Sequence, residues 1–323
     1  MATLAEIRAK LKAQENNSGP RNNEDGDALF AHWNMQDGEN SLIRFLPDAD
    51  PDNTFFWRER QQINLTFPGI RGEDENKNTT IRVPCVEMWG ESCPILNEIR
   101  PWWKDPSLED TARKYWKKRS YLMQGFVIET SIKEDKVPEN PIRKFIMTPQ
   151  IFNIIKAALL DPDMEYVPTD YDNGVNFVIS RTSKGGFNDY STSKYARRET
   201  ALTDEQRAAI DQHGLFTLND WMPARPTADG LKAIHEMFEA SVNGDLYDPE
   251  RWGQFYRPYG LAAPANTGRD TSSAPAPKPQ ESAPAQQAAP QPQAQAEPVN
   301  EAAAAPAGSA KDILAKIRSR QSA

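Results

Sequence analysis

The sequence contains few of the residues and motifs that mark the common classes of enzyme and membrane protein. Its 323 residues include two cysteines and three histidines, too few cysteines for a disulfide framework and in keeping with a reducing compartment. No stretch approaches the roughly 18 consecutive apolar residues of a membrane span. The chain also has no Walker-type phosphate loop, no HExxH and no G-x-S-x-G motif. These absences predict a soluble, intracellular protein that is not an enzyme.

Positive charge is scarce overall but concentrated in one place. The chain has 46 acidic and 38 basic residues and a formal net charge of −8, which argues against indiscriminate binding to polyanions. The stretch 113–121 nevertheless reads RKYWKKRSY. In such a mixture cations contact phosphates, and a Tyr or Trp ring stacks on a base for roughly 1–3 kcal/mol. The pattern favours a site for unpaired DNA or RNA; the alternative is a solvated helix face with both aromatic rings turned inward.

The hydrophobic pattern predicts a mainly β fold with helical additions (α+β), because short strands alternate with Gly, Pro, Asn and Asp clusters. Short strands with one interposed helix are more typical of a small barrel, such as the OB-fold, than of a parallel sheet. The helix follows Thr148, with Pro149 at its first position. The predicted strands are Ser41–Phe45, Phe55–Leu65, Thr79–Val83, Tyr121–Thr130, Arg143–Met147 and Val175–Ser180.

The chain divides into a folded body with different segments at its ends. The body covers 28–258, with a helical lobe from about 200 that includes helices opening at Thr203 and at Thr227. Residues 261–310 are nearly all Ala, Pro, Gln or Ser, a composition typical of a disordered linker. Leu4-Ala-Glu-Ile-Arg8, in an amphipathic arm at 1–20, is echoed by Leu314-Ala-Lys-Ile-Arg318 in a basic peptide at 311–323.

A second cluster of aromatic and basic residues lies at 184–195, KGGFNDYSTSKY. Its rings, Phe187, Tyr190 and Tyr195, sit among small polar residues that cannot bury them locally, and Lys194 adds a cation. They are either plugs for a neighbouring core or stacking platforms, and the similarity to the first cluster favours stacking. Weaker candidates are Trp102, Trp103, Lys144 and Phe145.

The candidates for metal binding are incomplete. Cys85 and Cys93 supply two ligands of the four that a structural zinc site needs, and no histidine lies nearby in the sequence. We therefore interpret them as buried, unligated thiols. The acidic run at Asp161, Asp163 and Glu165 could hold a divalent cation but is read more simply as a solvated turn.

Several short motifs resemble the single-stranded-DNA-binding (helix-destabilising) protein of T-even-type bacteriophages. They are SLIRFLP at 41–47, SCP at 92–94, KKRSY at 117–121 and GFNDYSTSKY at 186–195, in the family's order across roughly 28–200. The resemblance implies an OB-fold core with a basic groove for single-stranded DNA and cooperative assembly along the strand. It also implies contacts with phage replication, recombination and repair proteins, in the cytoplasm of an infected bacterial host.

The residue patterns and the resemblance together give the predicted DNA-binding residues. By motif, the resemblance assigns Lys117, Lys118, Arg119 and Tyr121 to the backbone and a base. It assigns Phe145, Phe187 and Tyr190 to the same groove. The full predicted set is Arg113, Lys114, Tyr115, Trp116, Lys117, Lys118, Arg119, Tyr121, Lys144, Phe145, Phe187, Tyr190 and Lys194.

The sequence also departs from the family. The family binds a structural zinc through one His and three Cys, but Leu65 and Leu96 stand where the His and the last Cys belong, so we expect no cofactor. The family's acidic C-terminal tail is replaced by the basic KDILAKIRSRQSA. Cations in the N-terminal arm could serve the family's cooperative docking. An RNA-binding translational regulator, or a scaffold acting through its terminal helices, is the alternative function.

Overall fold

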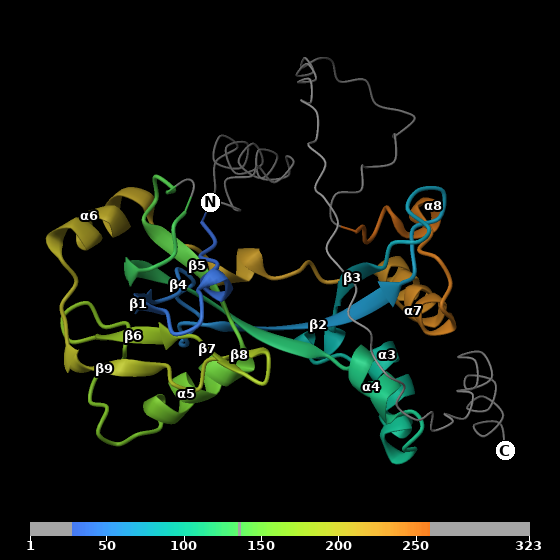
Figure 1. Cartoon of the computed structure of the whole chain (residues 1–323). Helices are drawn as coiled ribbons and strands as arrows, with labels where there is room; N and C mark the ends of the chain where they lie inside the picture. The colour runs from blue at the N-terminus through green and yellow to red at the C-terminus, as the bar shows by residue number, and fades with distance from the viewer. Residues whose placement is uncertain (1–27, 135–136, 259–323) are drawn as a thin grey trace, which may run out of the picture. The chain divides into compact units, whose positions relative to one another are not determined.

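The computed structural model describes residues 28–134 and 137–258. This part of the chain is a mainly antiparallel β-sheet protein with short helices (Figure 1). None of its described helices has the length and apolarity needed to cross a membrane. The predicted arm at 1–20, linker at 261–310 and basic peptide at 311–323 lie outside the described residues.

The main sheet contains all the strands that the sequence predicts, with ends shifted by a few residues. Its order is β3 (Thr79–Pro84), β2 (Arg58–Phe67), β4 (Lys118–Thr130), β1 (Asn40–Leu46), β6 (Val175–Ser180) and β9 (Lys194–Glu199), and β5 (Ile142–Met147) pairs with β4 off this path. A separate hairpin joins β7 (Thr182–Lys184) to β8 (Phe187–Asp189).

Strand β4 is hydrogen-bonded to three neighbours. Its first residues pair with β2, its middle with β5 and its last with β1, all antiparallel. Gly125 lies where β4 passes β1, and a Cβ at this position would lie 2.0 Å from the carbonyl oxygen of Arg44. The close approach of the two strands therefore requires glycine here.

The core lies between the sheet and helix α5 (Pro149–Leu159). Thr148 caps this helix by accepting a hydrogen bond from the Ile151 amide, and Pro149 occupies the first turn, as predicted. Phe152 of α5 stacks on Tyr121 of β4 at a ring-centroid distance of 3.5 Å. A second cluster, which includes Phe126 of β4, packs against residues near helix α6 (Asp204–His213).

The segment between β3 and β4 is helical, which the sequence pattern did not indicate. Its helices are too short to show a 3.6-residue period in hydrophobicity, and prolines interrupt the segment. Tyr115 ends the last of these helices, and β4 begins at Lys118. The helices are η2 (Val86–Trp89), α3 (Pro94–Ile99), η3 (Arg100–Lys104) and α4 (Glu109–Tyr115).

The chain forms two compact units by contact density. Among the described residues, unit 1 contains 28–64 and the described part of Arg82–Leu231, and unit 2 contains Leu65–Ile81 and 232–258. The predicted helical lobe is thus divided: α6 and η4 (Leu218–Trp221) belong to unit 1. Most of α7 (Ala228–Asn243) and all of α8 (Pro249–Trp252) belong to unit 2.

Unit 2 has an aromatic centre of its own. The ring of Tyr247 lies 5.6 Å from both Phe67 and Trp252, and its hydroxyl donates to the carbonyl oxygen of Tyr256 at 2.6 Å. The Ser241 hydroxyl of α7 donates to the Thr66 carbonyl oxygen at 2.7 Å. These contacts join the end of β2 to α7 and α8 within the unit.

One titratable side chain is deeply buried in unit 1. His32, in the short helix η1 (His32–Asn34), has 1% of its surface exposed, and its ring contacts those of Trp33 and Tyr190 edge-on. Burial lowers its pKa from 6.5 to about 4. Between these two pH values the unfolded chain binds more protons than the folded one at this site.

Acid should therefore destabilise the protein through His32. The stabilising contribution is complete above pH 6.5 and is lost as the pH falls toward 4, with a loss of at most about 3 kcal/mol. A His32→Gln variant should show a weaker decline in the free energy of unfolding between pH 7 and pH 4.5, measured by urea denaturation. Parallel pH profiles for the two proteins would contradict this assignment.

Candidate nucleic-acid interface

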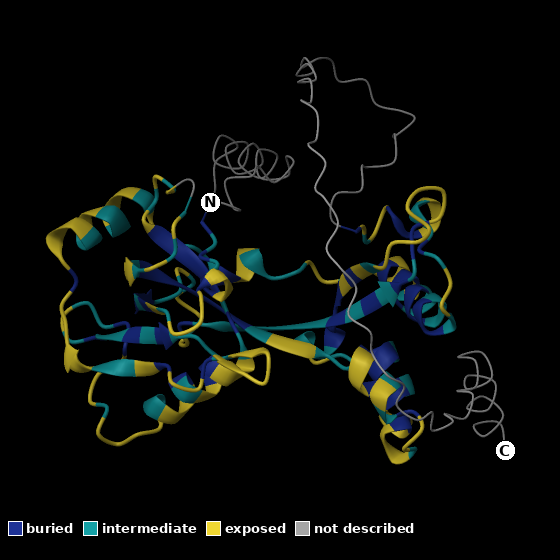
Figure 2. Ribbon diagram, in the orientation of Figure 1, coloured by how far each residue is buried: buried dark blue, intermediate teal, exposed yellow. Residues whose placement is uncertain are grey.

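The basic stretch RKYWKKRSY is half helix and half strand. Arg113, Lys114 and Tyr115 form the last turn of α4, and β4 starts at Lys118. Figure 2 shows that the start of β4 is exposed, beside the intermediate surface of β2. The cations of this stretch therefore lie partly on a helix and partly on a strand, and they do not form one helix face.

Three of the predicted cations are already paired with carboxylates. Arg113 bonds to Glu109 on the same helix at 2.6 Å, and Lys117 bonds to Glu87 at 2.6 Å. Arg119 lies 3.6 Å from Glu59 of β2. By contrast, Lys118 is exposed and donates to the Arg113 carbonyl oxygen at 3.3 Å, with no ion pair to any carboxylate in the described ranges. Lys114 is exposed and lies over the ring of Tyr115.

The aromatic residues of the stretch point mainly into the protein. Tyr115 is buried, and Trp116 is half-buried with its ring edge-on to Trp103 at 5.5 Å. Tyr121 is buried in its stack with Phe152. Burial raises the pKa of its hydroxyl, and the nearby Glu59 raises it further. Tyr115 and Tyr121 thus offer no free ring face to a base in this structure, because packing within unit 1 uses it.

Three more predicted contacts also lie in the interior. Phe145 is a fully buried core residue, and Tyr190 is buried with its ring edge-on to His32. Lys144 is 6% exposed and its ammonium lies 4.4 Å from the ring centroid of Phe216. A base or phosphate could reach these three only if the core rearranged, since Phe145 packs in the main core and Lys144 is covered on the opposite face of β5.

Phe187 is the predicted aromatic residue that the structure exposes most. It begins β8 after a turn in which Gly185 and Gly186 have φ of 60° and 81°, values that glycine adopts without strain. Its side chain is 80% exposed. Lys194, on β9, is also exposed. Lys194 lies far from Lys118 across the sheet, because β1 and β6 lie between β4 and β9. Phe187 belongs to the separate β7–β8 hairpin.

Two arginines that the sequence analysis passed over belong to the same sheet as Lys118. Arg60 is half-buried on β2 and donates from Nε to the Ser120 hydroxyl of β4 at 3.1 Å. Arg82 is exposed on β3. The available signal was the alternation of Arg58, Arg60 and Gln62 within a predicted strand, which places them on one face.

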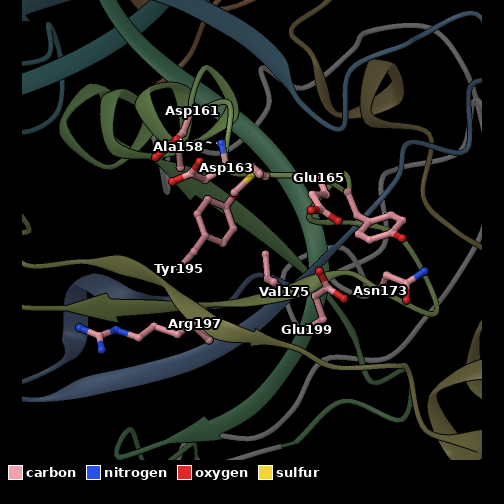
Figure 3. Close-up of a pocket in the computed structure, with 12 residues that line it drawn as sticks. Ala158, Asp161, Asp163, Glu165, Asn173, Val175, Tyr195, Arg197 and Glu199 are labelled. Atoms are coloured by element: carbon pink, nitrogen blue, oxygen red, sulfur yellow. Dashed lines mark hydrogen bonds between the residues drawn. The ribbon is translucent and has the colours of Figure 1, made fainter.

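A cleft of about 420 Å³ opens between the end of α5 and strands β6 and β9. Figure 3 shows the acidic side chains Asp161, Asp163, Glu165 and Glu199 that line it, together with Arg197. No set of three or more potential ligands in the described chain is arranged to hold a metal ion. An acidic lining repels phosphate, so this cleft is a poor site for nucleic acid.

Comparison with known protein families now assigns the chain. A family model described as gp32 DNA binding protein like matches residues 36–219, more than half of the 323 residues. The chain belongs to the gp32-like family of DNA-binding proteins. It is thus of the T4 gp32 type of single-stranded-DNA-binding protein. No curated protein matches the chain.

The two cysteines of this gp32-like protein lie close together. Both are buried and free, and the Cys85 thiol hydrogen-bonds to Cys93. That bond, with the amides of Leu96 and Ile95 at the start of α3, lowers the pKa of Cys93. The same bond, with burial, raises the pKa of Cys85. Leu96 is itself fully buried.

A substitution at Phe187 can test DNA binding separately from folding in this gp32-like protein. Because its ring is exposed, we expect Phe187→Ala to leave the free energy of unfolding unchanged. We expect it to weaken binding to oligo-dT about 5- to 150-fold, the range that corresponds to losing one stacked base. The measurements are urea denaturation and tryptophan-fluorescence titration.

Tyr115→Ala is the matched control for that variant. Its ring is buried, so this truncation should cost about 3–5 kcal/mol of stability. Unchanged oligo-dT affinity in Phe187→Ala would show that no base stacks on this residue.

Proposed function

We propose that this protein coats and protects unpaired DNA cooperatively during phage DNA replication, recombination and repair. The observation that carries the proposal is membership of a DNA-binding family over 36–219, a range that includes the exposed cations Lys118 and Lys194 and the exposed ring of Phe187. We further propose that the sheet of unit 1 is an OB-type barrel, and that the protein has no enzymatic activity.

The proposed mechanism combines two physical terms. When exposed cations that no carboxylate neutralises contact phosphates, the counterions condensed on the DNA are released. Binding should therefore weaken as the salt concentration increases. Stacking requires a base whose face is free, which a duplex does not offer until it opens. Binding to the unpaired state alone then stabilises melted DNA by mass action, with no need for ATP.

Cooperativity and partners belong to the proposal as well. Self-association along the strand would use the basic N-terminal arm, which contains Arg8, Lys10 and Lys12. Contacts with other phage replication and recombination proteins, and action in the cytoplasm of an infected bacterium, follow from the same role. The arm and the C-terminal basic peptide both lie outside the described residues.

We propose that this protein needs no zinc. Cys85 and Cys93 hydrogen-bond to each other, and Cys93 also accepts from the amides at the start of α3. The family's other two ligand positions are taken by Leu65 and Leu96. Elemental analysis should therefore find much less than one zinc per chain. Incubation with EDTA should leave the melting temperature unchanged, whereas one bound zinc per chain and a chelator-dependent fall in melting temperature would contradict the proposal.

Direct titration tests the main function. The eight tryptophans provide the signal, and the ligands are oligo-dT, oligo-rU and duplex DNA over a series of salt concentrations. We expect tight, salt-sensitive quenching by oligo-dT and much weaker binding to duplex. Preferential binding to oligo-rU would instead support the RNA-binding alternative. No binding to any ligand at low salt would reject the nucleic-acid role and direct attention to the terminal segments.

A further inference from the structure

The two faces of strand β2 differ in composition from Gln62 onward. On one face Ile63 and Leu65 are buried. On the other, Arg60, Gln62 and Asn64 alternate with them and keep partial exposure. Since side chains alternate along a strand, these three polar residues project from the same side of the sheet.

The neighbouring strands add further polar residues to this side. In the β2–β4 register, Arg60 lies opposite Ser120 and Gln62 lies opposite Lys118. Residues opposite each other in an antiparallel pair share a face, with Cβ atoms about 4.5–5.5 Å apart. Lys118 and Ser120 therefore extend the polar surface of β2 onto β4.

Strand β3 completes the surface with Arg82. The Cys85 amide donates to the Gln61 carbonyl oxygen at 3.0 Å, and the hydroxyls of Thr66 and Thr80 lie 3.4 Å apart. Both contacts fit one antiparallel register, in which Arg82 lies opposite Asn64. Three cations thus surround Gln62. We call this surface the Gln62 face; it consists of Arg60, Gln62, Asn64, Arg82, Lys118 and Ser120.

The cations of the Gln62 face lack the carboxylates that neutralise others nearby. Across the described ranges, Arg60, Arg82 and Lys118 make no ion pair, whereas Lys117 and Arg119 each have an acidic partner. Burial lowers the pKa of Arg60 to about 10, and the positive charge of Arg82 adds to this effect. Like charges held together in this way raise the free energy of the folded protein, and a bound polyanion would relieve the repulsion.

We propose that the Gln62 face binds the phosphate backbone of single-stranded DNA. This inference rests on the proposed function and identifies where on the sheet the strand is held. Arg60, steadied by Ser120, supplies a planar donor group suited to phosphate oxygens, and Arg82 and Lys118 supply two further positive charges. The amides of Gln62 and Asn64 offer donors and acceptors to base edges beside the backbone.

The test compares an Arg60→Gln/Arg82→Gln double variant with the wild-type protein. Each phosphate contact on a single strand contributes about 0.7 to the slope of log K against log salt concentration, so the double variant should lose about 1.4 from the magnitude of that slope. The slope is measured by oligo-dT titration at several salt concentrations. Because removing the charges relieves repulsion, the melting temperature should stay the same or rise, which a purely structural role for these arginines would not allow.

Lys156→Gln is the matched control. Lys156 is an exposed cation on α5, the helix whose Phe152 packs on Tyr121 and hence on the opposite face of β4. This variant should keep the wild-type slope. Arg82→Gln alone serves as a second test variant, because an exposed side chain can be replaced without disturbing the core.

The possible outcomes separate the two proposals. Tight wild-type binding with an unchanged slope in the double variant would overturn the Gln62 face while leaving the DNA-binding function intact, and would fit an acidic protein segment as its occupant. Absence of binding in the wild-type protein would overturn both. A reduced slope in the double variant, with a wild-type slope in Lys156→Gln, supports the assignment.

Discussion

The continuous pairing of β4 with three other strands is the constraint on which unit 1 depends. Tyr121 and Leu122 have β2 on one side and β5 on the other, and the later residues of β4 pair with β1. Gly125 permits the close passage of β1. Because side chains alternate along this one strand, its register decides that Lys118 and Ser120 face outward with Arg60 while Tyr121 faces α5. The core and the basic outer surface are thus two sides of the same strand.

Local signals in the sequence were sufficient to predict much of this fold. The strands follow from alternation and β-branched residues, and α5 and α6 follow from capping at Thr148 and Thr203, the latter a full capping box with Gln206. The short helices between β3 and β4 were missed because four to seven residues show no reliable period. The division of the helical lobe was also not predictable, since it depends on contacts between α7 and the distant end of β2.

Residue type alone does not show which of the predicted site residues are exposed and unpaired in the folded protein. The sequence suggested that the cations around Trp116 are free to bind phosphate. In the structure Lys117 pairs with Glu87, 30 residues earlier in the chain, and Arg119 pairs with Glu59, 60 residues earlier. Likewise, the sequence suggested that Tyr121 could stack on a base, but in the structure its ring stacks on Phe152. Tertiary contacts determine which charges are paired and which rings are exposed. Residue type alone does not reveal these contacts.

The lack of acidic partners on the Gln62 face has a consequence for how this protein can evolve. Its cations contribute little to folding and oppose one another, so substitutions there should be tolerated by the core. Selection could therefore raise or lower the grip on nucleic acid one residue at a time without endangering the fold. Arg113 and Lys117 differ from these cations, because each has a carboxylate partner in the folded protein and its substitution also removes an ion pair.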